Sequence, residues 1–209
     1  MAVLDSSIAF RARKSFGNLT LRFTGGRIIA SQRVTTSNQP NTIAQKKQKF
    51  KMRLLGKLSK VFQEQHQVSF NDRKPYHSTY NKFVSINKDA VTVDNNLDTT
   101  IHWEQILASK GLLPKVSLIT NVTHVAGTVT IEWNNAAGAE YDNDYISVTI
   151  VNSSNNDFVS TATTTTRAAE TIQVTMPIPT TGDDVKIYIA AYNPVTNQSS
   201  DSILVEINA

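Results

Sequence analysis

The sequence predicts an α+β fold in which a β-hairpin and helices come first and a β-sandwich follows. Two observations support this prediction. Helical periodicity is confined to the part of the 209-residue chain before Pro114, whereas short runs of alternating Val, Ile and Thr fill the part after it. We therefore expect two domains, a basic hairpin-and-helix anchoring region over 1–114 and an acidic sandwich over 115–209.

The first expected element is a β-hairpin over 18–33. Apolar and polar residues alternate from Leu19 to Thr24, and Gly25-Gly26 then offers the two positive-φ residues of a tight turn. An isolated hairpin is only marginally stable in water. We therefore expect this one to pack on another element or to extend another sheet.

Two helices are expected next, over 42–65 and 75–86. Thr42 and Gln45 have the spacing of a capping box at the start of the first helix, and Pro75 stands at an early position of the second. Gly56 indicates close packing or a bend in the first helix. Its predicted apolar face consists of Ile43, Phe50, Leu54, Leu58 and Val61, and a basic stripe lies beside that face.

The segment after the second helix predicts a turn and a strand. Residues 94–100 are rich in Asp and Asn, which is typical of a turn. Residues 101–108 fit either a strand or a short helix, and we expect a strand.

Seven short strands are expected in the C-terminal part, separated by clusters of Asn, Asp, Ser and Gly. This number and spacing indicate a sandwich of the immunoglobulin/fibronectin type III-like kind, and the lack of cysteine favours the fibronectin-like version. Trp133 is expected in its core. The expected strands span 116–122, 128–133, 144–151, 157–162, 171–176, 185–192 and 202–207.

Charge is divided unequally along the chain. Residues 1–114 hold 18 Lys and Arg against 7 Asp and Glu, a balance of +11, whereas residues 115–209 hold 3 against 10, a balance of −7. The basic half therefore predicts a negative partner: nucleic acid, an acidic protein surface, or the acidic half of a neighbouring copy. The expected docking residues are Arg11, Arg13, Lys14, Arg22, Arg27, Lys46, Lys49, Arg53, Lys57 and Lys60.

The residues give no pattern of an active site. The chain has no cysteine, and its four histidines, which we expect at the surface or in an interface, lack metal-ligand spacing. Asp94, Asn96 and Asp98 match the first positions of a calcium loop, but the glycine and the final glutamate are missing. No stretch approaches the roughly 20 apolar residues of a membrane span. We therefore expect no catalytic residue, no cofactor, no bound metal and no membrane partner.

Several segments together resemble a known group of proteins. They are 14–19, Gly25-Gly26, 39–45, 109–114 and 130–133. In this order they resemble an uncharacterised family, a domain of unknown function, found in Bacteroidetes bacteria and their phages, including the crAss-like group. The resemblance implies no active-site residues. It implies a basic N-terminal region, an immunoglobulin-like C-terminal domain and a place in the virion.

From these observations we expect a non-enzymatic structural protein of a bacteriophage virion, made in the host cytoplasm. An auxiliary or minor capsid protein is the first expectation, with other virion proteins and copies of itself as partners. A head-to-tail connector or tail ring protein is the alternative within the same particle. Non-specific nucleic-acid contact and an adhesion or glycan-binding module are the alternatives of other classes.

Overall fold

The computed structural model divides the chain into two compact units, 1–42 with 74–76 and 43–73 with 77–209. The division therefore differs from the boundary predicted at Pro114, which falls inside the second unit. The residues that the structure describes are 2–4, 15–16, 19–24, 27–32, 42–70, 77–125, 127–153, 157–161, 165–175 and 184–208.

The first unit contains a four-stranded antiparallel sheet with the order β1-β4-β3-β2. Strands β3 (Leu19–Thr24) and β4 (Arg27–Gln32) are the predicted hairpin, and Leu21 pairs with Ala30 in its register. Its Gly25-Gly26 turn lies outside the described residues. The added strands β1 (Ala2–Leu4) and β2 (Ser15–Phe16) confirm that the hairpin extends into a larger sheet.

Three helices open the second unit: α1 (Ile43–Val61), α2 (Gln63–Gln67) and α3 (Thr79–Asn87). The single helix predicted over 42–65 is thus interrupted at Phe62 and continues as α2. The Ser78 side chain accepts a hydrogen bond from the Asn81 N–H at 3.2 Å and so caps α3. The predicted start of that helix, Pro75, lies outside the described residues.

The buried face of α1 differs from the predicted one by roughly a quarter-turn. Leu55 and Leu58 are buried, but Ile43 is 60% exposed and Phe50 37% exposed. The prediction was wrong for the first half of the helix because hydrophobicity alone does not show which side meets a partner. A Cβ atom on Gly56 would lie 3.6 Å from the Tyr80 hydroxyl, so α1 and α3 pack closely there, as predicted.

A short hairpin follows the helices. It pairs β5 (Val91–Val93) with β6 (Thr99–Ile101), and the Asp94 carboxylate accepts hydrogen bonds from two backbone N–H groups of the predicted turn. The strand predicted over 101–108 was wrong beyond Ile101, since Trp103–Gln105 is a 3-10 helix. The described residues contain three more 3-10 turns, at Lys88–Ala90, Ala139–Tyr141 and Arg167–Ala169.

The C-terminal strands form two sheets, and every strand pair within them is antiparallel. Six of the predicted strands lie within one residue of the observed bounds, whereas the first lies three residues later than predicted. One sheet has the order β11-β8-β7, with β7 (Ile119–Val125), β8 (Thr128–Trp133) and β11 (Thr171–Thr175). The other has the order β10-β9-β12-β13, and β14 also pairs with β12. Its strands are β9 (Tyr145–Asn152), β10 (Asp157–Thr161), β12 (Asp184–Asn193), β13 (Gln198–Ser199) and β14 (Ile203–Asn208).

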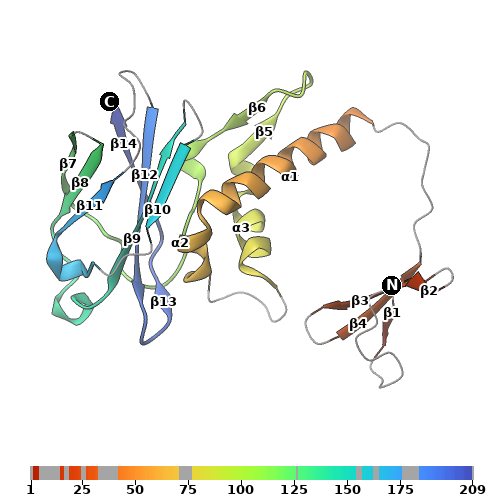
Figure 1. The fold of residues 1–209 in the computed structure, drawn as a ribbon, viewed down its shortest axis with the longest axis horizontal. Coiled ribbons are helices and arrows are strands. Elements are labelled where there is room, and N and C mark those ends of the chain that lie inside the picture. Colours follow the sequence, from red (N-terminus) through yellow and green to blue (C-terminus); the bar gives the residue numbers. More distant parts are fainter. Residues whose placement is uncertain are drawn as a thin grey trace. The chain divides into compact units, whose positions relative to one another are not determined.

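Two apolar cores hold the second unit together. The first lies between the two sheets and includes Ile131, Trp133 and Ile187, which confirms Trp133 as a core residue. The second lies between the helices and the other face of the larger sheet, where Phe62, between α1 and α2, meets Tyr188 of β12. Figure 1 shows the helices on one side of β9 and β12 and the smaller sheet on the other. The structure is therefore mostly β-sheet with a few helices, in agreement with an α+β or β-rich class, and the helices and both sheets lie in one unit.

Candidate docking surface

Five cationic side chains form a ridge along α1. All five are exposed, and they lie on the side of the helix opposite to the buried Leu55 and Leu58. With a rise of 1.5 Å per residue, the ridge is about 20 Å long. We call it the basic ridge; it consists of Lys46, Lys49, Arg53, Lys57 and Lys60.

The basic ridge has no acidic partner within the part of the chain that the structure describes. The Arg53 guanidinium lies 5.8 Å from the centre of the Phe50 ring, which is the one contact of a ridge cation seen among the described residues. The neighbouring Lys47 instead donates a hydrogen bond to the Asn95 side chain at 2.7 Å. The ridge charges are therefore exposed to a partner.

The other predicted docking residues do not belong to this surface. Arg22 is exposed on β3, and Arg27 begins β4, so both lie in the first unit. Arg11, Arg13 and Lys14 lie outside the described residues.

All three cations of residues 115–209 lie beside a carboxylate. The Lys186 ammonium is 2.9 Å from Asp184, and this contact lowers the pKa of that carboxyl. The other two ion pairs are Lys115–Asp201, at 3.6 Å, and Arg167–Asp144, at 3.7 Å. The surplus negative charge of the acidic half therefore falls on its remaining carboxylates.

Four of those carboxylates gather at one end of the smaller sheet. Asn135 connects two of them, since its backbone N–H donates to Glu170 at 2.9 Å and its side-chain amide donates to Asp142. The backbone N–H of Trp133 donates to the backbone carbonyl of Glu170, so the end of β8 lies against the start of β11. We call this surface the acidic end; its carboxylates are Glu132, Glu140, Asp142 and Glu170.

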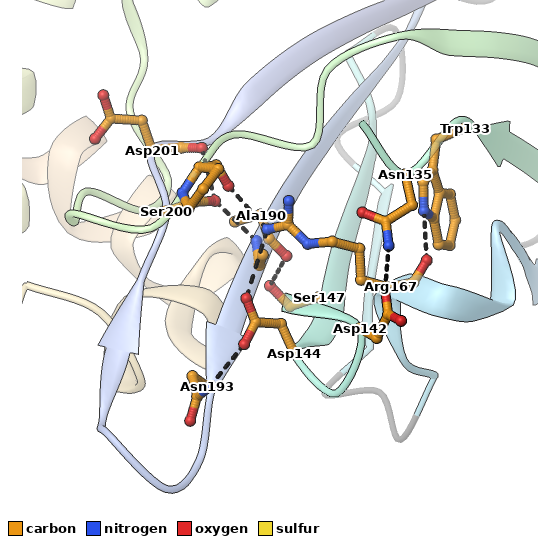
Figure 2. Close-up of polar contacts among 12 residues, drawn as sticks. Trp133, Asn135, Asp142, Asp144, Ser147, Arg167, Ala190, Asn193, Ser200 and Asp201 are labelled. Carbon is orange, nitrogen blue, oxygen red and sulfur yellow. Dashed lines mark hydrogen bonds and ion pairs between the residues drawn. The ribbon is translucent and has the colours of Figure 1, made fainter. Parts of the chain in front are cut away.

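Arg167 and Asp144 form a buried ion pair near Trp133, Asn135 and Asp142 (Figure 2). The side chains of Arg167 and Asp144 are 2% and 0% exposed. Arg167 also donates to the Pro114 carbonyl at 2.8 Å, and its own carbonyl accepts the Trp133 indole N–H at 3.0 Å. Asn193 donates to the Asp144 carboxylate at 2.8 Å. These contacts join the segment before β7 to the 3-10 turn before β11. The pair therefore stabilises the packing of these two segments.

Sequence reasoning missed this pair. The signal that could have found it is that Arg167 is the single arginine of residues 115–209, between Thr166 and Ala168 in an otherwise polar and small-residue stretch. Burial lowers the pKa of its guanidinium, and the Asp144 charge opposes that shift.

The prediction that every histidine lies at a surface or an interface was wrong for His66, which is 4% exposed. Its Nε2 atom is 2.8 Å from the Ser59 carbonyl, so Nε2 carries the proton and donates it. Its ring packs against Phe83, at 5.5 Å between ring centres. The other nitrogen, Nδ1, is buried without a partner among the described residues. Burial therefore lowers the pKa of His66.

This burial predicts a loss of stability in mild acid. In the unfolded chain His66 takes up a proton near pH 6.5, whereas in the folded chain it takes up the proton only at a lower pH. The free energy of unfolding should therefore fall as the pH drops below 6.5, by about 1.4 kcal/mol for each pH unit between the two pKa values. Urea denaturation between pH 7.5 and 5.5 would measure this loss.

The variant His66→Gln tests that prediction, and His77→Gln is its matched control. Glutamine can still donate to Ser59 but does not titrate, so His66→Gln should remove the loss. His77 is exposed, so its replacement should leave the loss unchanged. An equal pH dependence in the two variants would contradict the assignment to His66.

No described group of His, Asp and Glu side chains is arranged to hold a metal ion. A recess of about 10 Å³ beside Trp133 and Arg167 admits one water molecule and is too small for a substrate. Across the described ranges, no helix is both long and apolar enough to cross a bilayer. The exposed, unpaired cations of the basic ridge make it the candidate functional surface among the described residues.

Comparison with known protein families shows where the chain belongs. The profile of a family of unknown function, DUF6266, matches residues 22–205. This match covers the ridge and both sheets except the last three residues of β14, and the chain therefore belongs to that family. A search of curated proteins finds no match.

Proposed function

We propose that the chain is a non-enzymatic structural component of a bacteriophage virion, an auxiliary or minor capsid protein. In this role the basic ridge docks onto an acidic protein surface of the particle. The observation that carries the proposal is the exposed row of five cations with no acidic partner among the described residues. The phage setting is supported by the resemblance noted from segments such as 109–114 and 130–133.

We also infer that the two sheets are a fibronectin type III-like sandwich that presents the ridge at a distance from the smaller sheet. The strand order supports this inference. The first, second and fifth strands (β7, β8, β11) share one sheet, and the fourth strand, β10, pairs with the third, β9. In the constant-type immunoglobulin arrangement the fourth strand would instead lie beside the fifth.

Reversing the charge of the ridge centre tests the docking role. The variant Lys49→Glu with Arg53→Glu should lower the copy number in purified particles by about tenfold or more, because like charges across an interface cost several kcal/mol. Quantitative mass spectrometry of particles from an infected host would measure incorporation, and circular dichroism would confirm that the isolated variant is folded.

The matched control is Lys88→Glu with Lys110→Glu. Both lysines are exposed and lie outside α1, so this variant has the same charge change at another place. It should be incorporated normally. Normal incorporation of the ridge variant, or an equal loss in both variants, would overturn the docking role.

A second measurement tests whether the ridge binds nucleic acid instead of a protein. Sedimentation of the chain with a random-sequence DNA duplex should show no co-sedimentation at physiological salt. Binding that falls steeply with salt, with a slope reduced by the ridge variant, would replace the protein partner with DNA phosphates.

A further inference from the structure

We propose that the basic ridge of one copy docks onto the acidic end of a second copy. This inference rests on the proposed function, because it names the acidic surface that the ridge binds. It makes the chain its own partner in a repeated assembly.

The two surfaces cannot meet within one chain. The ridge belongs to α1, which lies on one side of β9 and β12, whereas the acidic end belongs to the smaller sheet on the other side of that layer (Figure 1). Both surfaces lie in the same compact unit, 43–73 with 77–209, so no hinge between units brings them together. Their opposite charges can therefore neutralise each other only between molecules.

The charges of the two surfaces complement each other in number and availability. The ridge offers five cations, and the acidic end offers four carboxylates that make no ion pair among the described residues. Each cation of residues 115–209 pairs with another carboxylate, and among the described residues none forms an ion pair with the acidic end. The ridge of a second copy would supply the missing positive charge.

Hydrogen bonds hold part of the acidic end in place before any partner arrives. Asn135 holds Glu170 through its backbone and Asp142 through its side chain, and Asn121 donates to Glu132 at 3.4 Å. Fixed carboxylates lose little side-chain entropy when they bind. Long lysine side chains on α1 can then adapt to them.

The geometry predicts a head-to-tail contact. A two-fold dimer would need each copy to offer both surfaces toward the other at the same time, and the surfaces lie on opposite sides of the larger sheet. A head-to-tail contact leaves one ridge and one acidic end free, so further copies can add until a ring closes or a filament grows.

Two neutralising variants of the full chain test this proposal. The ridge variant is Lys49→Gln with Arg53→Gln. The acidic-end variant is Glu140→Gln with Glu170→Gln, in which glutamine keeps an acceptor for the Asn135 N–H. Lys88→Gln with Lys110→Gln is the control, since it removes the same charge as the ridge variant from exposed positions outside α1.

Sedimentation velocity at 20 mM and 500 mM salt would measure assembly. The wild type and the control variant should form species larger than the 23.1 kDa monomer at low salt and return to monomer at high salt. Each test variant alone should stay a monomer. An equimolar mixture of the two should form a dimer and nothing larger, because each variant supplies the one surface that the other lacks.

A wild type that stays monomeric at low salt would overturn the self-docking proposal, and so would a mixture of variants that forms no dimer. Neither result would overturn the proposed function, which depends on incorporation into particles. If the ridge variant is excluded from particles while the wild type does not self-associate, the ridge binds a different acidic protein.

Discussion

Replacing Arg167 with alanine should lower the free energy of unfolding by about 3–5 kcal/mol, because the Asp144 carboxylate would stay buried without its counter-charge. The variant would also lose the 2.8 Å hydrogen bond to the Pro114 carbonyl. Asp144 would keep the Asn193 amide as a donor, but a single amide does not replace a cation in a buried site. Urea denaturation followed by tryptophan fluorescence would report the change, since Trp133 contacts Arg167 directly.

A matched pair of variants separates the buried charge from the loss of packing. Arg167→Met keeps most of the side-chain volume and leaves the Asp144 charge unpaired. Adding Asp144→Asn removes that charge and keeps an acceptor for Asn193. The double variant should therefore be more stable than Arg167→Met alone, by about 1 kcal/mol or more. If the second substitution gives no gain, the ion pair does not carry the effect.

Replacing Phe62 with alanine should cost about 3–5 kcal/mol, because this fully buried ring joins the helices to the larger sheet. Its ring centre lies 4.8 Å from that of Tyr188 in an edge-on arrangement and 6.0 Å from that of Phe83. The cavity would open where α1, α3 and β12 meet. Thermal or urea unfolding would measure the loss.

Phe50→Ala is the control for that substitution, because Phe50 lies on the preceding helix and is 37% exposed. It should change the free energy of unfolding by no more than about 0.5 kcal/mol. Trp103 and Trp133 both lie in the second unit, so tryptophan fluorescence follows that unit alone. By this measurement the Phe62→Ala variant should unfold in a single transition, since the helices and both sheets are one unit. Two separate transitions would show instead that the helices and the sheets fold independently.

The strands could be predicted because their residues alternate locally, but the second apolar core could not. On β9, the face that meets the helices carries Ser147, Thr149 and Val151, all buried. Two of these three residues are polar, so the sequence pattern is that of a strand with one face in water. Their burial depends on helices far away in the chain, which no local pattern reports.

The same reason explains the quarter-turn error on α1. Ile43 and Phe50 are apolar, but α3 and the larger sheet cover the side that carries Leu55 and Leu58. The basic ridge itself could be predicted, since five cations at spacings of three and four residues align on any helix. The acidic end could not, because its carboxylates come from β8, the turn after it and the turn before β11.

The second core has a consequence for synthesis of the chain on the ribosome. Phe62 and Phe83 are made first, and their partner Tyr188 follows only after β9, β10 and β11. At usual rates of translation, the delay between Phe83 and Tyr188 is roughly 5–20 s. During that time the apolar sides of the emerging helices have no sheet to cover them. The nascent chain is therefore expected to be a chaperone substrate, with the order of its segments setting how long it needs protection.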